Sequence, residues 1–175
     1  PASVIYNGAA QTPCSGTITA PGVSQAASPL VYANNTNTGT ASVSYSYAGT
    51  ANVNSSSGTA TFGITAANVT ITASAPTITY GTAVPSITYT SSVAGLTWNP
   101  SITCAAYASS DTAYSTALTG IQNAGTYVTH CANGSNANYT PTYVNGTLTI
   151  TKASSTSVIT CTPTSLAYNA AAQTP

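Results

Sequence analysis

Charge is almost absent from this 175-residue chain. It holds one Lys or Arg, one Asp or Glu and one His, and charged residues make up 1% of it, against about a quarter in an ordinary soluble domain. The sequence therefore offers no basic surface for nucleic acid, no carboxylate cage for a metal ion and no carboxylate pair for glycoside hydrolysis. No apolar run approaches the roughly 20 residues of a membrane-spanning helix. We expect no nucleic-acid partner, no membrane insertion, no metal and no cofactor.

Helix-forming residues are scarce as well. Met is absent, Phe occurs once, and Thr, Ser, Ala, Asn, Val and Tyr dominate, with 12 Tyr in all. Thr, Val and Tyr favour strands, and 13 Gly with 10 Pro interrupt the chain at short intervals. This composition predicts an all-β fold whose surface is made of hydroxyl and amide groups.

The four cysteines are far apart and form no CxxC pair, because they stand at Cys14, Cys104, Cys131 and Cys161. With a single His in the chain, zinc ligation would need all four of them. Disulfides are the simpler interpretation, and they predict an oxidising, extracellular location. Six Asn-x-Ser/Thr sequons are candidate glycosylation sites in such a location: Asn34, Asn54, Asn68, Asn133, Asn138 and Asn145.

A long internal repeat links the two ends of the sequence. Residues 1–13 read PASVIYNGAAQTP and residues 163–175 read PTSLAYNAAAQTP, which agree at nine of thirteen positions with a constant offset of 162 (163 − 1). Such self-similarity at a fixed period indicates a repeat architecture. The sequence is expected to be one period, plus an overlap, of a longer tandem array.

A second, weaker repeat divides the period into two modules. NTGT at 37–40 matches NAGT at 123–126 at an offset of 86, and both copies end on an alternating segment, at 58–65 and 146–153. The predicted domains are an Ig-like module over 1–66 that lacks its first strand, a related module over 67–153, and the opening strands of the next copy over 154–175. The junctions contain no Gly-rich or Pro-rich linker, which favours a stiff, extended string.

Alternating segments and turn signals locate the expected strands. In the first module they are 3–6, 14–20, 30–33, 40–47 and 58–65. In the second they are 68–73, 77–80, 86–90, 101–107, 125–131 and 146–151. Strands at this spacing predict tandem Ig-like antiparallel β-sandwich modules in an extended array.

The disulfide predictions follow from this division. Cys104 and Cys131 fall within strands of the same module, so we expect them to pair. Subtracting 162 from Cys161 places its equivalent just before Pro1, in the copy that contains Cys14. Cys14 is therefore expected to bond the Cys161 equivalent of the preceding copy, and Cys161 the Cys14 equivalent of the following one.

The residues of both modules resemble known families. The first module, with VIYNGAAQTPC and SVSYSYAGTANVNSSSGTATFGIT, resembles the bacterial Ig-like repeats of large surface proteins. The second, with ITYGTAVPSITYT, NAGTY and VNGTLTITKA, resembles the MBG domain of the YGX type, which occurs in repetitive secreted adhesins. The resemblance implies a β fold in a surface protein, and it carries no catalytic residue onto this sequence.

Few single residues invite a chemical role. Lys152 could form an isopeptide bond beside Asp111, but its place at a module junction favours a solvated linker residue. Asp111 is expected to cap a turn, and Trp98 to pack in a core rather than stack on a sugar. His130 is adjacent to Cys131 on a strand, so the two side chains point to opposite faces and are badly placed for catalysis. No GxSxG elbow supports a Ser–His–Asp triad.

These observations favour a structural role over an enzymatic one. The chain is predicted to be a repeat unit of an extracellular fibre, stalk or sheath that self-associates with further copies through strand complementation and disulfides. The alternative is an adhesive or carbohydrate-binding module of a surface adhesin, with surface glycans as partners. Ice binding by a Thr-rich face is disfavoured, because no regular short TxT period is present.

Overall fold

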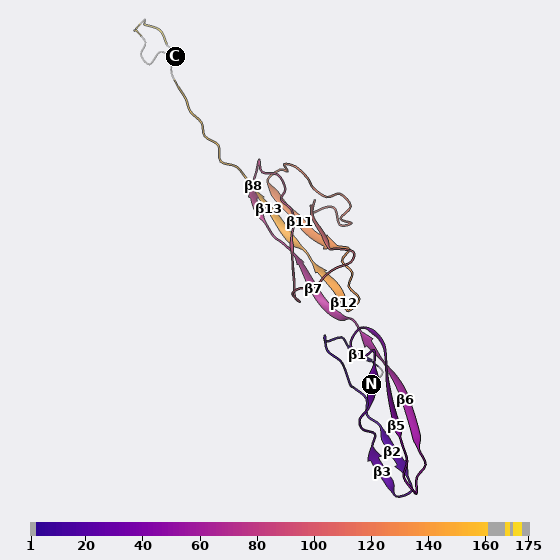
Figure 1. Ribbon diagram of the computed structural model, residues 1–175. Coiled ribbons are helices and arrows are strands. Elements are labelled where there is room, and N and C mark those ends of the chain that lie inside the picture. The colour runs from indigo at the N-terminus through magenta and orange to yellow at the C-terminus, as the bar shows by residue number, and fades with distance from the viewer. Residues whose placement is uncertain (1–2, 161–166, 169, 173–175) are drawn as a thin grey trace.

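The structure is a computed structural model, and it describes residues 3–160, 167–168 and 170–172. That part of the chain contains thirteen β-strands and no helix, which confirms the predicted all-β class. The strands form two modules that lie end to end, and the chain leaves the second module at the end remote from the first (Figure 1).

The first module is built around a four-stranded sheet with the order β1-β6-β5-β4. A separate hairpin, β2-β3, lies beside it. Its small core consists of Ala41, Phe62 and Ile64, with Tyr32 packed against them. The strands of this module are β1 (Ser3–Ile5), β2 (Thr17–Ala20), β3 (Val23–Ala26), β4 (Val31–Ala33), β5 (Gly39–Tyr47) and β6 (Ser56–Thr65).

The second module contains two sheets, with the orders β8-β13-β11-β10 and β12-β7-β9. Its larger core lies between them and includes Val69, Ile71, Leu148 and Ile150, all nearly inaccessible to solvent. Trp98 is half-buried and packs against this core, as the sequence predicts. The strands are β7 (Ala67–Ala73), β8 (Thr77–Thr79), β9 (Tyr89–Ser91), β10 (Thr103–Tyr107), β11 (Gly125–Ala132), β12 (Tyr139–Val144) and β13 (Gly146–Thr151).

The four-stranded sheets of the two modules share one skeleton. Gly39 pairs with Ile64 across β5 and β6, and Gly125 pairs with Ile150 across β11 and β13, so β5 and β6 correspond to β11 and β13 at an offset of 86. Val4 pairs with Ile64 as Ile78 pairs with Ile150, which relates β1 to β8 at an offset of 74. The same offset relates β4 to β10, through their pairing with β5 and β11.

The change of offset from 74 to 86 marks an insertion of 12 residues in the second module (86 − 74). The loop that joins β10 to β11 spans 108–124, whereas its counterpart between β4 and β5 spans 34–38. The added residues include Asp111 and Tyr114. The two modules therefore differ most in this loop, while their sheets keep the same order and register.

The strand pairing corrects one part of the prediction, because the sheets are mixed rather than antiparallel. Strand β1 pairs with β6, β8 with β13 and β7 with β12 in the parallel sense. The reason is the end-to-end arrangement. The chain enters each module at one end and leaves at the other, so the entering and leaving strands run in the same direction.

Two strands are absent from the sequence prediction. One is β3, the second strand of a hairpin that turns at Pro21 and Gly22, where the glycine has a φ of 76°. The other is β12, which contains Pro141 and lies at the edge of its sheet. An edge position tolerates proline because the residue has no N–H to donate to a neighbouring strand.

Residues 154–160 form no strand, although the opening strand of another module was expected there. Every residue from Thr151 to Thr160 is exposed, with Val158 at 83% and Ile159 at 91%. In Figure 1 this segment extends away from both modules. Residues 161–166 of the predicted opening strands, Cys161 among them, lie outside the described residues.

Candidate assembly site

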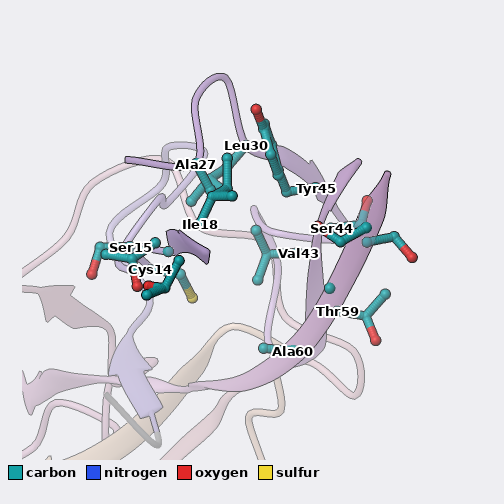
Figure 2. Close-up of a pocket in the computed structure, with 16 residues that line it drawn as sticks. Cys14, Ser15, Ile18, Ala27, Leu30, Val43, Ser44, Tyr45, Thr59 and Ala60 are labelled. Carbon is teal, nitrogen blue, oxygen red and sulfur yellow. The ribbon is translucent and has the colours of Figure 1, made fainter. Parts of the chain in front are cut away.

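An open groove of about 420 Å³ runs along one side of the first module. Residues 14–19 form one wall, residues 56–60 form the other, and residues 43–45 form the floor. In Figure 2 the side chains of Ile18, Leu30 and Val43 border the open space between the walls. Strand β6 thus forms one wall of the groove, apolar side chains line it, and open space separates the two walls.

The second module has a strand in the corresponding place. There β7 lies between β9 on one side and β12 on the other. With the two offsets applied, the counterpart of β9 in the first module is 15–17, which lies within one groove wall. The counterpart of β12 is 53–58, which overlaps the other wall at 56–58. Within the described residues, no strand of the first module occupies the place that β7 fills in the second.

The cysteine of the first module stands at this groove. Cys14 lines it, is half-buried, and is unpaired among the described cysteines. The Tyr32 hydroxyl fixes the backbone here, since it accepts a hydrogen bond from the Cys14 N–H at 3.1 Å and donates one to the Cys14 carbonyl at 3.0 Å. These two hydrogen bonds fix the Cys14 backbone at the groove wall.

The cysteines of the second module pair as the sequence predicts. Cys104 and Cys131 are direct partners across β10 and β11, with their Cα atoms 4.1 Å apart, and they are joined in a disulfide. In the first module the corresponding positions are Leu30 and Tyr45, which border the groove. A covalent bond in one module is thus replaced by an apolar pair in the other.

Direct hydrogen bonds connect the two modules at their junction. Only Ala66 separates β6 from β7. Asn138 accepts hydrogen bonds from the Thr38 N–H at 3.0 Å and the Thr38 hydroxyl at 3.1 Å, and its amide donates to the Asn37 side chain at 3.1 Å. The rings of Tyr6 and Tyr139 meet edge to face 5.4 Å apart. These contacts restrain the angle between the modules.

Replacing Asn138 with alanine should loosen this joint without unfolding either module. The substitution removes three intermodule hydrogen bonds, each of which contributes about 1 kcal/mol. We expect the modules to tumble more independently, with shorter rotational correlation times in ¹⁵N relaxation, whereas Asn54→Ala on an exposed loop should leave relaxation unchanged. Identical relaxation in Asn138→Ala and the parent chain would refute a hydrogen-bonded joint.

The six sequons differ in their surroundings. Asn34, Asn54, Asn68, Asn133 and Asn145 are exposed, whereas Asn138 is half-buried. The Asn138 amide nitrogen that a glycan would modify already bonds Asn37. A glycan at Asn138 would therefore compete with the joint. The side-chain amides of Asn133 and Asn145 also donate hydrogen bonds, to the Thr103 hydroxyl at 3.0 Å and to the Tyr114 hydroxyl at 2.7 Å. Glycosylation at all six sites stays a prediction.

The residues considered for catalysis serve to anchor the inserted loop. Asp111 accepts hydrogen bonds from the backbone N–H groups of Thr116 and Ser115, both at 2.9 Å, which confirms its expected role in a turn. The hydrogen bond from the Thr116 N–H, aided by those from Ser115, holds the pKa of the Asp111 carboxyl below its ordinary value. His130 contacts the Asn145 side chain at 2.8 Å and stacks on Tyr114 with ring centroids 3.8 Å apart.

In the part of the chain that the structure describes, no three His, Cys, Asp or Glu side chains gather as a metal site. None of its segments is a helix long and apolar enough to cross a membrane. Lys152 is exposed directly after β13, where a solvated linker residue is expected.

Comparison with known proteins supports one of the two resemblances. No curated protein and no solved structure matches the chain. Domains of the MBG family are found in surface and repeat proteins and are non-catalytic repeat-type domains. Residues 69–149, which make up most of the second module, match the family model of the MBG domain, YGX type.

Proposed function

We propose that this chain is a structural repeat unit of an extracellular fibre, stalk or sheath, and that copies associate through strand complementation and disulfides. The observation that carries the proposal is the pairing of an open groove in the first module with an exposed apolar segment beyond the second. A protein made of such units would transmit tension along its sheets and across its short junctions.

The chemistry of the surface supports this role. With a formal net charge of zero and 1% charged residues, the chain has almost no charge repulsion to oppose contact between copies. The intramodule disulfide suits an oxidising compartment, and MBG domains are typical of extracellular surface proteins. The adhesin alternative gains less support, because Trp98, the candidate sugar platform, packs against a core.

The proposed bond between copies joins Cys14 to the Cys161 equivalent of another copy. Two thiols would lose two protons and two electrons to form one disulfide, and one dioxygen molecule would accept them to give hydrogen peroxide. The oxidising location inferred from the Cys104–Cys131 disulfide supplies that acceptor. The bond would make each contact between copies resistant to pulling.

The experiment is to purify the 175-residue chain and follow its mass by sedimentation velocity as its concentration rises. We expect linear oligomers, visible as thin threads by electron microscopy, at neutral pH and with little dependence on salt because almost no charge can be screened. In air, part of the population should resist denaturant until a reductant is added. A chain that stays monomeric but saturates with one glycan on an array would instead establish the adhesin function.

A further inference from the structure

We infer that the groove of the first module accepts residues 154–160 of a second copy of this sequence, with the Ile159 side chain as the anchor. The inference rests on the proposed function, because it names the contact through which copies associate. It assigns a donor segment, an acceptor surface and a register, which the proposed function leaves open.

The register follows from the sequence of the second module. At a constant offset of 88, Ile71 corresponds to Ile159, Thr72 to Thr160 and Tyr80 to Tyr168. The segment 155–161 is therefore the counterpart of β7 for a first module. In β7, Ile71 is fully buried, with 0% exposure, whereas Ile159 is 91% exposed. Docking would remove the exposed apolar surface of Ile159 from water, as the core does for Ile71, so Ile159 serves as the anchor of the donor segment.

The direction of the donor strand is fixed by the pairing of β7. That strand runs parallel to β12, with Ile71 opposite Tyr143, and antiparallel to β9, with Ile71 opposite Ser91. Transferred by the offsets, Ile159 of the donor lies opposite Ser57 on one wall and Thr17 on the other. The donated backbone would hydrogen-bond on both sides, as in recognised cases of strand addition.

The donor segment has a natural end. From Pro163 onward the sequence repeats residues 1–13, and the acceptor already supplies that part, since its own β1 pairs with β6. The residues before Pro163 correspond to no strand among the described residues of the first module. At the same offset of 88, Cys161 corresponds to Ala73, the last residue of β7, so it would enter at the groove that Cys14 lines.

The surfaces at the two ends of the chain agree with this docking. Tyr6 and Asn37 of the first module make the joint to the second. Their counterparts in the second module, Tyr80 and Asn123, are exposed at its far end, Tyr80 by 50%. The counterpart of Asn138 is Asn52 in the first module, which is also exposed. A second copy placed end to end would bring Asn52 to Asn123 and rebuild the hydrogen-bonded joint.

The geometry produces a chain of copies rather than a closed dimer. The donor segment leaves one end of the molecule and the groove lies in the module at the other end (Figure 1). Each copy therefore donates at one end and accepts at the other, which is a heterologous contact that propagates into an open filament.

The experiment uses two variants with complementary defects. Ile159→Asp places a charge on the donor anchor but leaves the groove intact. Gly58→Phe fills the groove, because Gly58 shares a face of β6 with the buried Phe62, and a Cβ at Gly58 would meet no atom within 4 Å. That open space lets the variant fold. Matched controls are Thr156→Asp, whose counterpart Asn68 is exposed, and Thr61→Phe on the outer face of β6.

Sedimentation velocity gives the readout. We expect each variant alone to need at least a tenfold higher concentration for association, and both controls to assemble like the parent chain. An equimolar mixture of Ile159→Asp and Gly58→Phe should form one-to-one dimers and nothing larger, because only one donor and one acceptor remain. If either variant alone assembles like the parent chain, the inferred groove contact is wrong. The proposed function is not contradicted by that result, because the copies still associate.

If the parent chain does not associate at any concentration, the proposed function is wrong. A second measurement then tests whether the groove binds the donor segment. A synthetic peptide of residues 154–160 is titrated into full-length Ile159→Asp while amide NMR signals are followed. Shifts at Thr17 and Gly58 that are lost in the Ile159→Asp, Gly58→Phe double variant support the groove as the acceptor. No shift at millimolar peptide overturns it.

Discussion

Leu148→Ala should lower the free energy of unfolding of the second module by about 2–5 kcal/mol. Leu148 has 0% exposure and lies in the core between the two sheets, so its truncation leaves a cavity that the paired strands β11 and β13 prevent from closing. Trp98 packs against the same core and is the only tryptophan of the chain. Its fluorescence should follow the loss during denaturant titration.

The first module supplies the matched comparison. Phe62 is the counterpart of Leu148 at the offset of 86 and is 2% exposed, so Phe62→Ala should destabilise its own module by about 3–5 kcal/mol. Because the modules meet through a few hydrogen bonds and one ring pair, we expect Phe62→Ala to shift the far-ultraviolet dichroism transition and leave that of Trp98 in place. Equal shifts of the Trp98 transition by both substitutions would mean that the modules unfold as one unit.

The fold class and most strands could be predicted because the side chains that alternate in the sequence are the ones that the tertiary structure buries. In β5 the alternation of Val43, Tyr45 and Tyr47 with serine gives a half-buried strand, and the structure buries that face. Strand β12 was missed because Pro141 lies within it, although its Tyr139 and Tyr143 side chains pack against the core and the strand itself lies at the edge of its sheet. A Pro-Gly pair such as Pro21-Gly22 is typical of a turn, but the polar residues of β3 give no alternating pattern that would predict a strand after it.

The candidate site could be predicted only in part, because it depends on distant segments. The sequence indicates the donor region, since the long repeat predicts the opening strands of a further copy over 154–175. It does not indicate the groove, whose walls at 14–19 and 56–60 are brought together by β5 and β6. Nor does it indicate the Asn138 joint, because Thr38 and Asn138 are 100 residues apart. In the sequence, Asn138 is recognisable only as part of a sequon, which predicts a glycan and not a contact between modules.

The disulfide of the second module should contribute a stabilisation comparable to the core residues. The closed segment contains the inserted loop 108–124, the longest irregular stretch between paired strands of either sheet, so the bond restrains an unfolded chain that would otherwise be free to open. With a sequence separation of 27, the chain-entropy relation gives about 3–4 kcal/mol, within the usual range of about 2–5 kcal/mol. Its loss should also loosen Asp111 and Tyr114 on that loop.

Cys104→Ala combined with Cys131→Ala is the direct test, and the chain contains its own control. The first module has Leu30 and Tyr45 at the same two positions, so at concentrations too low for copies to associate its stability depends on packing and not on redox state. We therefore expect the double substitution, or a reductant, to move the Trp98 transition to lower denaturant and to leave the transition of the first module where it was. Peptide mapping without reduction should recover Cys104 and Cys131 as one linked pair. Recovery of both as free thiols, or an unchanged Trp98 transition in reductant, would show that the second module is held by its core alone.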